Sequence, residues 1–110
     1  MGVQAFTKTG NTIVLTANVA APSAVQVSST TLGGNQYRII NSQGGNLAFL
    51  GYGATASDAA NAAAVISTTG PAIPLLPGTD EILTFAPNAY FTAITSSGTS
   101  TIYITPGDGL

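Results

Sequence analysis

The sequence predicts an all-β fold: one antiparallel β-sandwich of jelly-roll type over residues 1–110, with about eight or nine short strands. Three observations predict it. Thr, Ile and Val are abundant, and the aromatic residues stand inside short apolar runs, as is typical of strands. Turn residues separate these runs at a spacing of about 8–12 residues. The length of 110 residues fits one domain that can bury its own core.

Eight segments are expected as strands, and most of them follow a turn containing Gly, Pro, Asn or Asp. They are residues 12–16, 24–28, 36–41, 46–51, 72–76, 81–85, 90–95 and 101–105. Short connections rich in Gly and Ser join the third strand to the fourth and the seventh to the eighth. These connections predict two hairpins, over residues 36–51 and 90–105.

The hydrophobic pattern of the strands predicts which faces are covered. Ile102 and Ile104 alternate with Thr and Tyr residues, so the last strand has one apolar face. The runs 13–15 and 48–50 are apolar without alternation, which is typical of strands covered on both faces. One cover would be the partner sheet, and the other would be a loop or another chain.

Residues 55–64 interrupt the β pattern because they are rich in alanine. Ser57 or Asp58 could cap a helix of one or two turns in this segment. So short a helix is marginal alone, so a mobile loop that orders on contact is an equal alternative.

The composition excludes several classes of function. Charged residues make up 5% of the chain, against about 25% in ordinary domains. Without His or Cys there is no structural zinc site, disulfide, thiol nucleophile or imidazole base. Two basic residues cannot neutralise a nucleic-acid backbone, and no apolar stretch is long enough to span a membrane. We therefore expect a binding or structural protein that is not an enzyme and has no cofactor or metal.

The few carboxylates do not converge in the predicted fold. Asp80 and Glu81 are adjacent in an extended segment, so their side chains point to opposite faces of the sheet. Asp80 also ends a Pro-Gly-Thr-Asp turn, where Asp is favoured for local hydrogen bonding. Asp108 is a lone carboxylate in a terminal turn, whereas calcium needs several oxygen ligands.

Arg38 is the single arginine and lies in the middle of a predicted strand. Its side chain could lie along the surface with its head in water. Alternatively, it could form an interfacial ion pair with Asp80 or Glu81.

Low charge also predicts association with other chains. Small soluble domains stay apart largely through interspersed surface charge, and strand edges without charged residues tend to pair with other strands. We therefore expect a homo-oligomer or a component of a larger shell.

Four motifs resemble, in their order, those of small virion proteins of tailed bacteriophages. They are residues 37–41 (YRIIN), 49–53 (FLGYG), 74–82 (PLLPGTDEI) and 103–110 (YITPGDGL). The family's pattern also has a strand of the type YFxAI, which residues 90–94 match. The resemblance covers most of residues 36–110. It implies a β-sandwich capsid decoration (cement) protein or another head-associated protein. Such a protein would bind the outside of the capsid as a dimer or trimer, with no chemistry.

The resemblance also implies which residues meet a neighbour on the virion. The arm from Gly2 to Thr7 and the tail from Pro106 onward are the natural segments to lie across another chain, since free termini need to be tied down. With Arg38, the candidate interface residues are Val3, Gln4, Ala5, Phe6, Arg38, Pro106, Gly107, Asp108 and Leu110. In the alternative interpretation, residues 3–6 form an edge strand of their own sandwich.

The partners expected from this resemblance are the chain itself and a major capsid protein. The location would be the capsid surface, after assembly in the host cytoplasm, because the N-terminus has no pattern of a secretory signal. A second functional class is a host-surface or glycan-binding module displayed on a virion or cell. That class needs at least two tyrosines clustered in an open groove, and Tyr52 and Tyr103 are the candidates.

Overall fold

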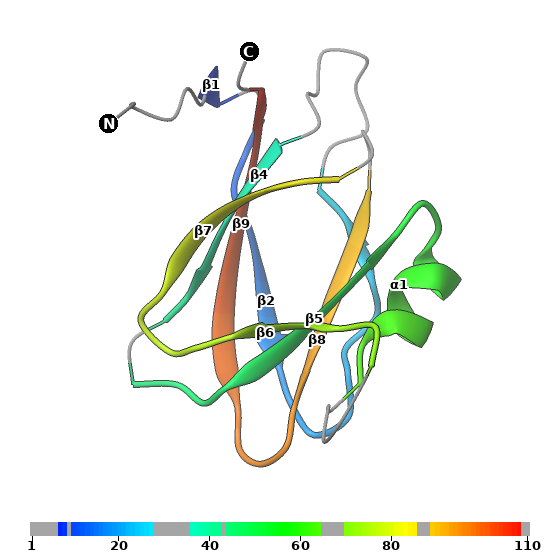
Figure 1. Ribbon diagram of the computed structural model, residues 1–110, viewed down its shortest axis with the longest axis vertical. Helices are drawn as coiled ribbons and strands as arrows, with labels where there is room; N and C mark the ends of the chain where they lie inside the picture. The colour runs from blue at the N-terminus through cyan, green and yellow to red at the C-terminus, as the bar shows by residue number, and fades with distance from the viewer. Residues whose placement is uncertain are drawn as a thin grey trace.

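The computed structural model describes residues 7–8, 10–27, 36–42, 44–64, 70–85 and 89–108, without the side chains of Thr7, Lys8 and Asp108. Over these ranges the chain is mostly β: two antiparallel sheets pack as a β-sandwich that carries one short helix (Figure 1). This confirms the predicted fold class. No helix in this part of the chain is long and apolar enough to cross a membrane.

The first sheet is four strands wide. It contains β1 (Thr7–Lys8), β2 (Ile13–Ala17), β9 (Ser100–Asp108), β4 (Gln36–Asn41) and β7 (Asp80–Thr84). β1 and β2 both pair with β9 and follow one another along the same edge of it, while β4 pairs with its other edge. β2, with β1 beyond it, and β7 are therefore the two edges of this sheet.

The second sheet contains β3 (Val25–Gln26), β8 (Tyr90–Thr95), β5 (Ala48–Gly53) and β6 (Ile73–Leu75), in that order. Across the two sheets, β2 pairs with β9, β3 with β8, β4 with β7 and β5 with β6, all antiparallel. This nesting of strand pairs is the jelly-roll arrangement, as predicted.

The two predicted hairpins are wrong. β4 and β5 belong to different sheets, and so do β8 and β9. Their connections are arches that carry the chain from one layer to the other. Glycine and small polar residues suit a tight hairpin and an arch equally well, so local sequence does not separate the two. The true partners are distant in sequence, as in the pairing of β4 with β7 and β9.

A buried polar network fastens these arches at one end of the sandwich. Asn41 is fully buried. Its Nδ2 donates to the carbonyl oxygens of Asn46 at 3.0 Å and of Leu75 at 2.7 Å. Its Oδ1 accepts a hydrogen bond from the hydroxyl of Ser100, which is also buried. One amide thereby links β4 to the connection before β5, to β6 and to the start of β9.

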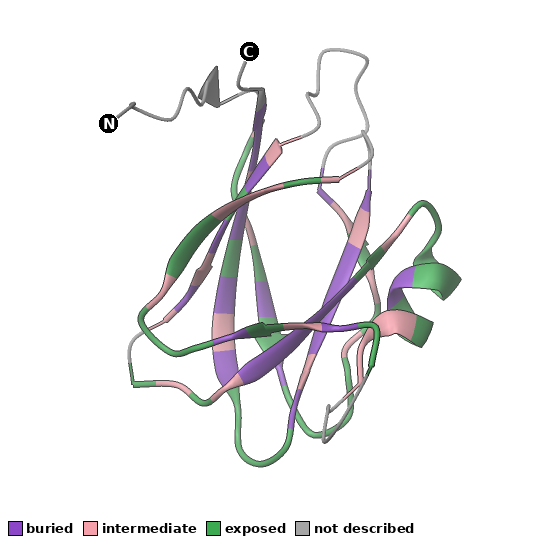
Figure 2. Ribbon diagram, viewed as in Figure 1, coloured by how far each residue is buried: buried purple, intermediate pink, exposed green. Residues whose placement is uncertain are grey.

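The inner faces of the two sheets form one apolar core (Figure 2). Tyr37 is fully buried, and its ring meets Phe91 edge-on with the centroids 4.9 Å apart. The Tyr37 hydroxyl oxygen accepts a hydrogen bond from the Ala89 N–H at 3.3 Å, so the buried oxygen has a partner. The core residues are Leu15, Ala17, Val27, Tyr37, Ile39, Ala48, Leu50, Leu75, Ala89, Phe91, Ala93, Ile102 and Ile104.

Of the two alternatives for residues 55–64, the structure has the helix, α1 (Ala56–Ala62). The predicted cap is wrong by two or three positions. Thr55 is the N-cap, and its hydroxyl oxygen accepts a hydrogen bond from the N–H of Asp58 at 3.1 Å. Ser57 and Asp58 lie inside the helix, because the chain becomes helical as soon as Thr55 satisfies one of the free N–H groups of the first turn.

α1 packs on the outward face of β5, at the right of Figure 1. A Cβ atom on Gly51 would lie 2.5 Å from the carbonyl oxygen of Ala59, so only glycine permits this close approach. Ala59 is fully buried, and Phe49 on the same outward face is 5% exposed. The second cover expected for residues 48–50 is therefore supplied within the chain.

We expect Asn41→Ala to lower the free energy of unfolding by about 2–4 kcal/mol, because it leaves the buried Leu75 carbonyl and the buried Ser100 hydroxyl without their partner. Urea unfolding followed by circular dichroism measures the change. Asn46→Ala is the matched control, since the exposed Asn46 side chain makes a single hydrogen bond, to the Thr99 carbonyl at 2.9 Å. Equal losses in both variants would contradict the importance of the Asn41 network.

Candidate functional site

The outer face of the first sheet carries a row of exposed and half-buried side chains. Val14, Tyr103, Ile40 and Asp80 are successive cross-strand partners on β2, β9, β4 and β7. Val14 is 58% exposed and Tyr103 is 39% exposed, which is unusual for large apolar side chains in the middle of strands. The row therefore crosses the whole width of the sheet as an apolar stripe with a carboxylate at one end.

A second row lies beside the first. Arg38 is opposite Thr105 on β9 and opposite Ile82 on β7. The hydroxyl of Thr105 is hydrogen-bonded to that of Thr12 at 2.6 Å, at the β2 end of the row. The two rows together form the first-sheet patch, which consists of Val14, Arg38, Ile40, Asp80, Ile82 and Tyr103.

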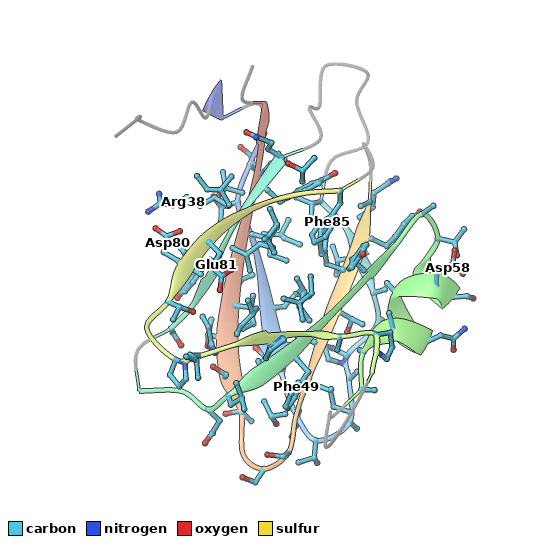
Figure 3. The ribbon with its side chains drawn as sticks, in the orientation of Figure 1. Arg38, Phe49, Asp58, Asp80, Glu81 and Phe85 are labelled. Atoms are coloured by element: carbon cyan, nitrogen blue, oxygen red, sulfur yellow. The ribbon has the colours of Figure 1, made fainter. Side chains whose placement is uncertain are left out.

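Arg38 and Asp80 form an ion pair at the β7 side of the patch (Figure 3). Nη2 of Arg38 lies 2.6 Å from Oδ2 of Asp80, and Nε lies 3.1 Å from both carboxylate oxygens. The hydrogen bond from Arg38 holds the pKa of Asp80 below its usual value, and the same bond raises the pKa of Arg38. The structure shows the expected ion pair of Arg38, with Asp80, and the place of this pair in an interface stays a prediction.

Both side chains of this pair remain open to water, at 48% and 44% exposure. Exposed pairs contribute little to stability, because water screens the charges and two long side chains must be ordered. The pair therefore leaves both charged groups accessible to a partner that approaches the face.

Glu81 lies on the other side of β7. Its cross-strand partner is Ile39, which is buried in the core, whereas the partner of Asp80 is Ile40 on the outer face. The two adjacent carboxylates thus point to opposite faces, as the sequence predicts. In the described ranges, no three acidic side chains are grouped as metal ligands and no pocket is found.

The remaining candidate interface residues lie at the chain ends. Pro106, Gly107 and Asp108 are the last residues of β9, and the first two are buried. Pro106 pairs with Tyr37, and Asp108 pairs with Thr7 of β1. The C-terminal tail, expected to begin at Pro106, is therefore part of β9 as far as Asp108. Val3, Gln4, Ala5, Phe6 and Leu110 lie outside the described residues.

Sequence reasoning singled out Arg38, with Asp80 as a possible partner, and named Tyr103 only as a glycan-binding candidate. It missed the other three members of the patch: Val14, Ile40 and Ile82. The run 13–15 contained a signal, since it lacks alternation and yet Val14 faces outward. Ile40 and Ile82 gave no separate signal, because an apolar residue in a strand is equally compatible with the core. Only the register of four strands places these side chains on one surface.

Comparison of the chain with protein-family models, with curated proteins and with solved structures finds no match. The site is therefore interpreted from its own geometry. An exposed apolar stripe with polar and charged residues at its margin is typical of a surface that binds another macromolecule.

We expect Asp80→Asn to lower the free energy of unfolding slightly at neutral pH, because it removes the charge that Arg38 stabilises. The pKa of Asp80 is lowered in the folded chain, so its contribution is complete above the unfolded carboxyl pKa of about 4. The contribution is lost as the pH falls through the lowered value. Urea unfolding of both proteins between neutral and acidic pH should show the difference vanishing in acid.

The control for this prediction is the same substitution in a chain that already carries Arg38→Ala. In that background, the effect of Asp80→Asn on the free energy of unfolding should not change between neutral and acidic pH in this way. A difference of the same size in the two backgrounds would show that Arg38 does not stabilise the charge.

Proposed function

We propose that the chain is a structural virion protein that binds the outer surface of a bacteriophage capsid and reinforces it, without catalysis. The observation that carries this proposal is the first-sheet patch, an apolar surface that the described part of the chain leaves open. The resemblance of residues 36–110 to small phage virion proteins supplies the class of partner. The jelly-roll fold is compatible with this class, since it occurs in capsid proteins and also in lectins.

The chemistry of the patch suits binding to another folded protein. The centres of protein interfaces are depleted of charged residues and enriched in aromatic ones, and here Tyr103 lies between Val14 and Ile40. Burial of these side chains would remove apolar area from water without stripping charges of their hydration. Thr16 and Thr101, paired beside this row, add hydroxyl groups that can donate to and accept from a partner.

The ion pair supports a defined orientation on the partner. Arg38 and Asp80 stand together at one side of the apolar row, so the patch is not symmetric. Charged groups at the margin of an interface fix its orientation more than they add affinity. Reinforcement follows from binding alone, because any ligand that binds only the assembled shell shifts the equilibrium towards assembly.

The alternative, a glycan-binding module, lacks a tyrosine platform in the described part of the chain. Tyr52 lies on β5 in the second sheet, where its ring stacks on Phe85 at a centroid distance of 3.9 Å. Tyr103 lies on the outer face of the first sheet. The two exposed tyrosines therefore do not share a face.

Binding to shells tests the proposal directly. Shells of the phage that encodes the chain, purified from a mutant that lacks it, are incubated with the purified protein and sedimented. We expect the protein to bind the shells saturably. We also expect DNA-filled shells that carry the protein to release their DNA at a higher temperature than shells without it. Tyr103→Lys should weaken binding by at least about tenfold, since it places a charge in the centre of the apolar row.

Ala60→Lys is the matched control, because Ala60 is exposed on α1, on the opposite outer layer of the sandwich. It should bind like the wild type. Loss of binding in Ala60→Lys but not in Tyr103→Lys would move the interface to the helix side. No binding of the wild type to shells, together with binding to host-cell glycans, would favour the alternative function.

A further inference from the structure

The edges of the two sheets differ in how well they are protected against pairing with another strand. A sandwich of two open sheets has four edges. Within the described residues they are β2, preceded by β1, and β7 in the first sheet and β3 and β6 in the second. Exposed edges present unpaired N–H and C=O groups, and proteins protect them with charges, prolines or short strands.

The β7 edge is protected by charge. Asp80 faces outward from this strand, and Glu81 points towards the interior side. An inward-pointing charge on an edge strand opposes pairing with a further strand, because the added strand would bury it. Two of the four acidic residues of the chain are thus placed on one edge.

The two edges of the second sheet are protected by other means. β6 has three residues, and the central one is Pro74, which has no N–H to donate. β3 has two residues and offers almost no ladder to a new strand.

β2 has none of these protections. It is five residues long, Ile13–Ala17, with neither a charged residue nor a proline. Its only ladder is with β9, so its other edge is unpaired in the described part of the chain. Apolar side chains are also exposed along this side of the molecule: Val14 at 58%, and Val25 of β3 at 37% although it pairs with the buried Phe91.

The types of side chain are arranged symmetrically in the sequence on either side of Val14. Val14 has Ile13 and Leu15 as neighbours, and beyond them stand Thr12 and Thr16. In an antiparallel pair centred on Val14, Ile13 of one copy would be opposite Leu15 of the other, and Thr12 opposite Thr16. Apolar residues would meet apolar residues and hydroxyls would meet hydroxyls, with every side chain on the correct face.

We propose that β2 pairs antiparallel with β2 of a second copy of this chain, about a two-fold axis beside Val14. The pairing joins the two first sheets into one continuous sheet. An interface of this kind is self-complementary, as two-fold symmetry requires. The self-complementary sequence is what favours a second copy over a strand from a different protein.

The dimer doubles the exposed apolar row. Ile40, Tyr103 and Val14 lie on adjacent strands, so the row continues directly into Val14, Tyr103 and Ile40 of the second copy. At a strand spacing of about 4.8 Å, these six side chains span about 24 Å. The inference goes beyond the proposed function and holds whether or not the bound surface is a capsid.

The test measures oligomeric state in solution, without any shell. Sedimentation equilibrium of the full chain should show a dimer forming as the protein concentration is raised to about 100 µM. A concentration this high is needed because one short strand pair is a small interface. Val14→Lys and Val14→Glu should each weaken dimerisation by at least about tenfold, because each places two like charges directly opposite one another. An equimolar mixture of the two variants should form a heterodimer, because the opposite charges then meet.

Thr84→Lys is the matched control, since Thr84 is an exposed residue on β7, the opposite edge of the same sheet. It should dimerise like the wild type. Val14 is more than half exposed, so its variants should keep the fold, which circular dichroism checks. If they do not, Thr16→Lys, also exposed on β2, should weaken the dimer instead.

Two outcomes would overturn the proposal: a wild type that is monomeric throughout this range, or a dimer that Val14→Lys leaves as tight as Thr84→Lys does. A mixture of Val14→Lys and Val14→Glu that stays monomeric would overturn the pairing centred on Val14. None of these results depends on binding to shells, so failure of the proposed function would be seen separately.

Discussion

A two-layer sandwich has two outer faces, and in the described part of this chain one helix of seven residues covers only one of them. Gly51 lets α1 approach the second sheet closely, and Ala59 is buried against it. Among the described residues no helix covers the first sheet, and Val14 and Tyr103 remain open to water. One sheet therefore has a covered outer face and the other has an exposed one. This difference is the basis of the proposed binding surface and of the orientation in which the chain would bind its partner.

The few charged residues of the chain lie at particular places on its surface. Arg38 and Asp80 mark one side of the first-sheet patch, and Glu81 protects the adjoining edge from the inner side. β2 itself has no charged residue, and the row that begins at Val14 meets its first charge only at Asp80 on β7. Because the chain has so few charges, their positions distinguish its edges. The β7 edge carries charge and resists pairing with another strand, whereas the β2 strand carries none and is open to such pairing.

Much of the fold could be predicted from the sequence, because strand signals are local. The bounds of β4 and β8 agree with the prediction at both ends, and the other predicted strands shift by a few residues. The connections could not be predicted, since the same glycines suit a hairpin and an arch, and the buried Asn41 that fastens the arches looks like a turn residue. In the site, the charge of Arg38 made it visible, whereas Ile40 and Ile82 became visible only through the register of β4 with β7 and β9.

The central claim is that the open face of the first sheet is the surface by which this chain binds its partner. The most direct measurement is a cryo-electron microscopy map of a particle that carries the chain. We expect the first sheet to face the shell, with Tyr103 in the contact and α1 towards solvent. A map in which α1 faces the shell and Tyr103 faces solvent would contradict it.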